Sequence, residues 1–200
     1  MNVALWKAQG VNNLTDARYF NTLDEAWISF DFDALNPQAV TLEKAKEIIG
    51  WLHEPQLVAV FGEHQDAAEI QYVMESTGIQ TIEFSLDHPL AFEEEFCSKA
   101  FISVFDDEID DAVAHPHHPF GWVIDVALAS HTDGQFIKKI KQLMQHSKVV
   151  FFTSTNAPEI TDWLKAIPGI GIQLDTEGEE KTGFSSVDVY EEVIEKVLSA

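Results

Sequence analysis

Short apolar runs alternate with longer amphipathic stretches from one end of the chain to the other. The short runs are rich in β-branched and aromatic residues and are too short for independent helices, so they predict strands. The stretches between them, such as 41–52 and 135–146, carry apolar residues at helical spacing and predict helices. The predicted strands are 3–8, 25–30, 56–61, 79–84, 100–105, 120–127, 148–153 and 169–174.

Polar residues mark where several of these helices begin. Asn13 precedes Leu14-Thr15-Asp16, and Thr41 precedes Leu42-Glu43. The side-chain oxygens of Asn and Thr accept hydrogen bonds from the free N–H groups of a first helical turn, which predicts helix starts at both places. Pro158 suits the first turn of the seventh helix, where a proline removes no helical hydrogen bond.

The alternation predicts the fold. Eight strand–helix units in 200 residues leave about 25 residues for each unit. Strict alternation of strand and helix implies a parallel sheet, and a count of eight favours a closed (β/α)8 TIM barrel over an open, doubly wound sheet. We therefore expect one α/β domain, a minimal barrel over residues 1–200, with no room for a second domain.

The charge excludes several classes of partner. Twelve basic residues against 34 acidic ones give a net charge of −22, and only Arg18 is an arginine. Such a chain is repelled by nucleic acid and by anionic membrane surfaces, so neither is expected as a partner. The single cysteine, Cys97, excludes an internal disulfide. The N-terminus resembles no signal peptide and no apolar run reaches the ~20 residues of a membrane span, so the expected location is cytoplasmic.

Acidic residues gather at the predicted barrel mouth. Barrel active sites form at the carboxyl ends of the strands, and about ten carboxylates follow those ends here, with Lys7 the nearest cation. This favours a cation, a metal or a polyol as ligand, although acidic residues also stabilise the helix N-termini on this face. Asp125 stands out because it lies inside a predicted strand, where an unpaired charge is costly. The metal candidates are Asp31, Asp33 and Asp106.

A family resemblance runs along nearly the whole chain. The segment 7–18, KAQGVNNLTDAR, resembles the N-terminal signature of phosphoribosylanthranilate isomerases, which reads roughly KICGITNLEDA. The segments 40–45, 58–61 and 79–89 follow the family pattern in the same order, and 123–125 resembles its sixth strand. The resemblance implies the same barrel, and an Amadori rearrangement of an aminoaldose phosphate in tryptophan biosynthesis.

The catalytic positions that the resemblance implies are only partly kept. The family uses a cysteine at the end of the first strand as general base, and that position is Gln9. An amide has no proton equilibrium suited to a base. The family's general acid, an aspartate on the sixth strand, matches Asp125.

The substrate-binding positions have also changed. A histidine after the fourth strand is absent from 83–86, and an arginine after the second strand matches roughly Gln38. The glycines that let backbone N–H groups approach a phosphate are replaced at 153–155 and 174–175. The positions that the resemblance assigns to substrate are Lys7, Gln38, Glu83, Ser85, Thr153, Ser154 and Asp175.

The losses predict an isomerase-like barrel without isomerase activity, a pseudoenzyme used for binding or regulation, with a small, cationic ligand at the mouth. One alternative is an active phosphoribosylanthranilate isomerase with Asp125 as acid and Glu83 or Asp175 as base. A second is a metal-dependent enzyme at the acidic mouth. No cofactor is expected, and the chain is expected to be a monomer or a homodimer.

Three further features have two interpretations each. The run 115–118 (HPHH) suggests a transition-metal site, but it precedes the sixth strand and so falls at the amino end of the barrel. Ser130, His131 and Asp125 suggest a hydroxyl–imidazole–carboxylate group, or simply a helix-capping histidine. Trp51 and Trp163, both in predicted helices, suit either core packing or an exposed patch.

Overall fold

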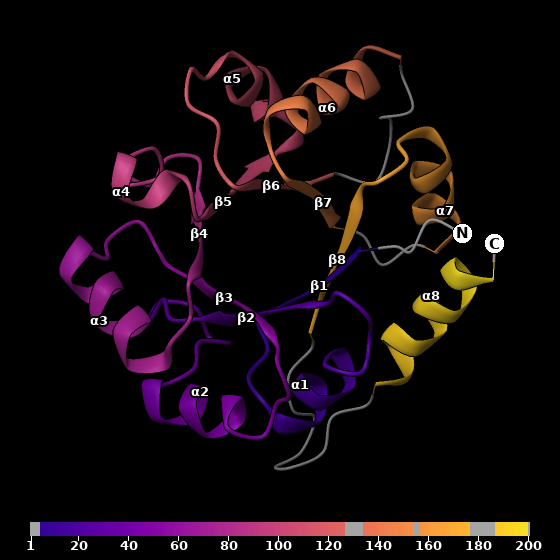
Figure 1. The fold of residues 1–200 in the computed structure, drawn as a ribbon. Helices are drawn as coiled ribbons and strands as arrows, with labels where there is room; N and C mark the ends of the chain where they lie inside the picture. The colour runs from indigo at the N-terminus through magenta and orange to yellow at the C-terminus, as the bar shows by residue number, and fades with distance from the viewer. Residues whose placement is uncertain (1–4, 127–133, 154–156, 177–186, 200) are drawn as a thin grey trace.

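Eight parallel strands form a closed barrel in chain order, because β8 pairs with β1 and completes the ring. The computed structural model describes residues 5–126, 134–153, 157–176 and 187–199. Figure 1 shows the ring of strands with the helices around it. The strands are β1 (Leu5–Gln9), β2 (Trp27–Asp31), β3 (Gln56–Val60), β4 (Thr81–Ser85), β5 (Ala100–Phe105), β6 (Gly121–Asp125), β7 (Val149–Thr153) and β8 (Gly171–Asp175). The fold expected from the sequence, a (β/α)8 TIM barrel, is confirmed.

A helix follows each strand, and the lengths differ widely. The helices are α1 (Leu14–Phe20), α2 (Leu42–Ile49), α3 (Ala67–Thr77), α4 (Glu94–Cys97), α5 (Ile109–Ala114), α6 (Gly134–His146), α7 (Ala157–Ala166) and α8 (Asp188–Leu198), with a 3-10 turn η1 (Asp106–Glu108) before α5. None of the helices in the described ranges is both long enough and apolar enough to cross a membrane.

The predicted helix starts at Asn13 and Thr41 are confirmed. Asn13 Oδ1 accepts a hydrogen bond from the backbone N–H of Asp16 at 2.9 Å. Thr41 Oγ1 accepts one from Lys44 N at 3.2 Å. Pro158 lies in the first turn of α7, as expected.

Four strands lie one or two residues later than the sequence predicts. The predicted runs 3–8, 25–30, 79–84 and 169–174 correspond to β1, β2, β4 and β8. The prediction ended each strand where the apolar run ends. Backbone pairing with the neighbours continues one residue further, through a polar residue at the mouth. As a result Gln9, Asp31, Ser85 and Asp175 are the last residues of strands and not the first residues of loops.

Aromatic rings fill the amino end of the barrel interior. Trp27, Phe101 and Phe120 meet edge to face, with ring centroids 5.2–5.7 Å apart, and Phe151 lies 5.6 Å from Phe101. Val58 and Val123 join the same cluster. The interior is therefore a packed apolar plug at this end, as expected for a barrel of eight strands.

The two helix-associated tryptophans differ in environment. Trp163 on α7 is 4% exposed and packs against Phe136 and Phe152, so it belongs to the layer between strands and helices. Trp51 is 67% exposed and lies just beyond the end of α2, so its prediction as a helical residue is wrong. The helix stops at Gly50 because the chain turns there towards β3.

Candidate functional site

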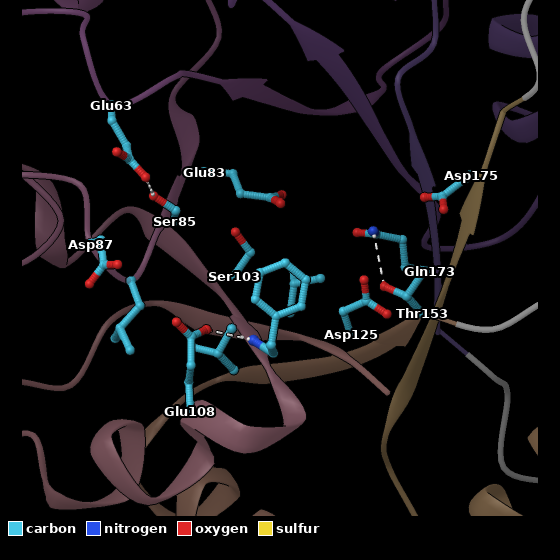
Figure 2. A pocket seen from close by; sticks show the side chains of 14 residues that line it. Glu63, Glu83, Ser85, Asp87, Ser103, Glu108, Asp125, Thr153, Gln173 and Asp175 are labelled. Carbon is cyan, nitrogen blue, oxygen red and sulfur yellow. Dashed lines mark hydrogen bonds between the residues drawn. The ribbon is translucent and has the colours of Figure 1, made fainter. Parts of the chain in front are cut away.

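A cavity of about 290 Å3 opens at the carboxyl end of the barrel. Its walls come from the last residues of β4, β5, β6, β7 and β8 and from the loops that follow β3, β4 and β5 (Figure 2). The lining residues are Glu63, Glu83, Ser85, Leu86, Asp87, Ser103, Val104, Phe105, Glu108, Val123, Asp125, Thr153, Gln173 and Asp175. The structure therefore brings Glu83, Ser85, Asp125, Thr153 and Asp175 together, as the sequence predicts.

All of the charged side chains that line this cavity in the described ranges are carboxylates. Figure 2 shows Glu63, Asp87 and Glu108 on one side, Asp125 and Asp175 on the other, and Glu83 between them. Carboxylates this close repel one another unless a cation or a proton is present. The field inside the cavity therefore attracts cations.

Lys7 lies below the cavity and is completely buried in the barrel interior. Its Nζ donates to Gln9 Oε1 at 2.5 Å and to Gln173 Oε1 at 2.6 Å, and lies 2.8 Å from Glu83 Oε2. An ammonium group has three N–H donors, and three acceptors surround it here. This lysine is therefore held as a charged group that supports the cavity floor.

Burial lowers the pKa of Lys7 from its ordinary 10.5, while the charges of Glu83 and Asp175 act in the opposite direction. The lysine charge is neutralised by Glu83, because the two side chains form a buried ion pair. Lys7 consequently offers little positive charge to a ligand in the cavity.

Asp125 is exposed at the carboxyl end of β6. The argument that its charge is buried inside a strand is therefore wrong, because the residue ends the strand where the barrel opens to solvent. Its place in the cavity lining is nevertheless the one expected for a functional carboxylate.

Asp175 ends β8 and pairs in register with Gln9 on β1. Protein atoms around the carboxyl group displace water and raise its pKa, the charge of Asp125 raises it further, and Lys7 opposes both effects. A carboxyl group with a raised pKa exchanges its proton nearer to neutral pH.

Sequence reasoning missed several cavity residues, among them Phe105, Glu108 and Gln173. Phe105 is 60% exposed, which is unusual for a phenylalanine that ends a barrel strand. It lies in register with Asp125, and its backbone N–H donates to Glu108 Oε2 at 2.7 Å. The alternation of Phe101, Ser103 and Phe105 along the strand was the available signal, since every second residue faces the barrel interior.

The expected metal candidates do not form a metal site. Asp31 Oδ1 accepts from Asp33 N at 2.8 Å and its Oδ2 accepts from Asn36 Nδ2 at 2.5 Å, so this carboxylate organises its own loop. Burial raises the pKa of Asp31. Asp106 lies in η1 after β5, three strands further round the ring. Within the described ranges, no three His, Cys, Asp or Glu side chains are arranged to hold a metal ion.

Gln38 lies outside the cavity lining, where its Oε1 accepts from Asn12 Nδ2 at 2.7 Å. The loop after β2 turns back towards α1, so this position faces a neighbouring loop and not the cavity. Ser130, His131 and Ser154 lie outside the described residues. The same is true of most of the loops that join β6 to α6, β7 to α7 and β8 to α8. Thr153 is described, and its Oγ1 accepts from Gln173 Nε2 at 3.2 Å.

The described histidines near the barrel ends have structural contacts. His88 is 3% exposed and stacks on Phe84, and its Nδ1 accepts from Leu90 N at 3.0 Å while Nε2 lies 3.1 Å from Gly62 O. Burial lowers its pKa. In the run 115–118, the ring of His115 stacks on Phe92 and the ring of His118 stacks on His146. Each of these two rings is engaged in packing, and among the described residues the run forms no metal-ligand cluster.

Several solved structures that are similar to this one are phosphoribosylanthranilate isomerases. The enzyme from Thermus thermophilus is 17% identical, with a TM-score of 0.71 over 98% of both chains. The enzyme from Thermotoga maritima is 14% identical, with a TM-score of 0.75 over 99% of this chain and 100% of that one. A third structure holds reduced 1-(o-carboxyphenylamino)-1-deoxyribulose 5-phosphate and is 14% identical, with a TM-score of 0.74 over 99% of this chain and 100% of that chain.

Comparison at the level of sequence finds no such relative. No protein-family model and no curated protein sequence matches this chain. The similarity therefore lies in the fold, where it extends over almost the full length of both chains. From one terminus of the barrel to the other, this chain shares the fold of the phosphoribosylanthranilate isomerases.

Proposed function

We propose that this protein binds a small organic cation at the barrel mouth and does not catalyse the isomerase reaction. The observation that carries the proposal is the cavity lining: among the described residues, six carboxylates line the cavity, and the lysine beneath it, Lys7, is paired with Glu83. A ligand that brings positive charge is attracted to this site, and one that brings negative charge is repelled from it.

The ligand of the isomerase fold is an anion at both ends. The compound held in the solved complex carries a carboxyphenyl group and a phosphate. A unit charge about 4 Å from a like charge costs on the order of 4 kcal/mol at an effective dielectric of about 20. Several carboxylates line this cavity, and the chain has a single arginine to oppose them.

The position of the family's base argues in the same direction. Gln9 ends β1, where the resemblance places a catalytic cysteine, and its amide oxygen accepts a hydrogen bond from Lys7. An amide cannot remove a proton from the substrate. The residue instead helps to hold the lysine in place.

Apolar surface in the cavity favours an organic cation over a metal ion. The exposed ring of Phe105 and the side chains of Leu86 and Val123 lie among the carboxylates. An aromatic face attracts an ammonium group by about 0.5–2 kcal/mol, and aliphatic walls attract an alkyl chain. A bare metal ion uses neither of these surfaces.

The first experiment mixes the purified protein with freshly prepared phosphoribosylanthranilate and follows the loss of substrate fluorescence. We expect no turnover above that of heat-denatured protein. In parallel, calorimetric titration with butylamine should show binding, and Phe105→Ala should weaken it several-fold. Turnover that Asp125→Asn abolishes would overturn the proposal. So would the absence of butylamine binding to the wild-type protein.

One observation favours a second candidate, an active isomerase. Asp125 lines the cavity at the position of the family's general acid, and the raised pKa of Asp175 suits a group that exchanges protons. In that case Asp125→Asn and Asp175→Asn should each reduce turnover by 100-fold or more, as general acids and bases contribute about 10²–10⁴-fold. Turnover that neither variant changes would reject this assignment.

A further inference from the structure

The carboxylates of the cavity form two groups that face each other across the mouth. In a closed ring of eight strands in chain order, β4 is diametrically opposite β8. Asp87 follows β4 and Asp175 ends β8. Figure 2 shows Glu63 and Glu108 on the side of Asp87, and Asp125 on the side of Asp175. We call Glu63, Asp87 and Glu108 the β4-side group and Asp125 and Asp175 the β8-side group.

The width of the barrel limits the length of a ligand that reaches both groups. Eight strands spaced ~4.8 Å apart and tilted by ~36° enclose a barrel about 15 Å across between backbones. Carboxylates that approach from opposite sides of this mouth are therefore separated by a gap on the order of 10 Å. A few methylene groups with a hydrogen-bonding group at each end span such a gap.

Glu83 is a further acceptor in the cavity, placed between the two groups. It is only 3% exposed and lines the cavity between the two groups. Its one polar partner among the described residues is the ammonium of Lys7, which lies 2.8 Å from Oε2. A carboxylate has about four lone-pair sites, so Glu83 can accept from an N–H donor in the cavity as well as from Lys7.

Apolar surface connects the two groups. Phe105 lies between them, because its N–H is bonded to Glu108 of the β4-side group and its strand partner in register is Asp125 of the β8-side group. Its ring is largely exposed. An alkyl chain that lies along this ring can therefore place a charge at each end.

We propose that the ligand is a dication, an alkane diamine or a close analogue, whose two ammonium groups bind the β4-side and β8-side groups while the chain crosses Phe105. This inference rests on the proposed function, and it names the class of cation that the same site takes. A monocation neutralises one group and leaves the other uncompensated. A dication of the right length neutralises both groups at once.

The test is calorimetric titration at fixed ionic strength with 1,4-diaminobutane and with butylamine, which has the same carbon chain and one charge fewer. We expect the diamine to bind about tenfold more tightly or better, because a second charge meets a second acidic group. In a series from 1,2-diaminoethane to 1,8-diaminooctane, affinity should pass through a maximum at an intermediate length.

Substitutions of single carboxylates test which residues bind the two ammonium groups of the diamine. Asp87→Asn and Asp175→Asn should each lower the affinity for the diamine towards that for butylamine. The matched control is Asp24→Asn, which removes an equal charge from an exposed turn before β2 and should leave the affinity unchanged. If Asp24→Asn weakens binding as much as the other two variants, the attraction is a property of the whole acidic surface, and the proposed dication site is wrong.

The possible outcomes distinguish failure of the dication hypothesis from failure of the organic-cation site itself. Equal affinities for diamine and butylamine, with Phe105→Ala weakening both, would overturn the dication and leave the organic-cation site standing. A diamine affinity that rises steadily with chain length would also overturn it, since the two groups are a fixed distance apart. Binding of neither compound would overturn the proposed function itself.

Discussion

The side chain of Lys7 marks the change from apolar to polar inside the barrel. Below it lie the rings of Trp27, Phe101 and Phe151, and above it lie the carboxylates of the cavity. Its partners Gln9, Glu83 and Gln173 come from three different strands. One residue therefore joins β1, β4 and β8 across the interior.

Removing the lysine should be costly mainly because of what remains. In Lys7→Met, the Glu83 carboxylate stays buried without its counter-ion, and we expect the free energy of unfolding to fall by about 3–5 kcal/mol. In Lys7→Met/Glu83→Leu no charge is left unpaired, so the loss should be smaller than for Lys7→Met alone. Urea denaturation of wild type, both single variants and the double variant measures this. A double variant whose loss equals the sum of the single losses would show that the two residues are not coupled.

The raised pKa of Asp175 makes stability depend on pH in a defined direction. The folded protein holds this proton at pH values where the unfolded chain, near the ordinary 3.8, has released it. The stability that this carboxyl group contributes is therefore fully present below pH 3.8 and is lost as pH rises through the raised pKa of the folded state. Asp175→Asn has no such proton. Its unfolding free energy relative to wild type should rise between pH 4 and pH 7, as measured by denaturation at several pH values. A constant difference would contradict the shift.

The candidate site could be predicted from the sequence only in part. Ser85, Asp125 and Asp175 were found because parallel strands place their carboxyl ends at one mouth, whereas Glu83 was named through the family resemblance. The pairing of Lys7 with Glu83 could not be predicted, because no local sequence pattern shows which of the eight strands supplies the partner of a buried lysine. The exposure of Asp125 was also missed, since one residue at a strand end decides between interior and solvent.

At the scale of elements, hydrophobic periodicity predicted every strand because apolar residues cover both faces of a barrel wall. It misplaced strand ends such as Asp31 and Ser85, since pairing and not hydrophobicity ends a strand. Hydrophobic periodicity also does not predict which small residues make room for the side chains of neighbouring strands. Two glycines are examples. Gly121 begins β6 and Gly171 begins β8, and the space beside them is taken by phenylalanine rings.

A methyl group at either glycine would collide with the plug. The Cβ of an alanine at 171 would lie 2.4 Å from Phe151 Cδ1. We expect Gly171→Ala to reduce the free energy of unfolding by about 1–3 kcal/mol, because the ring must leave its packed position. The matched control is Gly134→Ala at the start of α6, where a Cβ meets no described atom within 4 Å. Thermal denaturation compares the two. Equal melting temperatures would mean that the plug adapts without cost.

At the scale of the whole molecule, charge is the dominant property. A net charge of −22 on 200 residues repels itself in the compact state more than in the unfolded chain. The fold compensates with few cations, since only 12 side chains are basic and Lys7 is buried.

Added salt should therefore stabilise the protein. Between about 0.01 M and 0.15 M ionic strength the screening length falls from about 30 Å to about 8 Å, which removes most of the repulsion across the barrel. We expect the melting temperature to rise over this range by several degrees, equally for NaCl and KCl, as followed by circular dichroism. A melting temperature that does not change would show that repulsion between the acidic side chains does not limit the stability of the fold.

The aromatic plug at the amino end of the barrel determines how a ligand can enter and leave the cavity. Because Trp27, Phe101, Phe120 and Phe151 close that end, the described residues leave the cavity open at the mouth and not through the barrel. A molecule that enters the cavity must therefore leave through the same opening. A ligand that occupies both acidic groups should therefore be replaced by a competitor at its own dissociation rate, however high the concentration of the competitor.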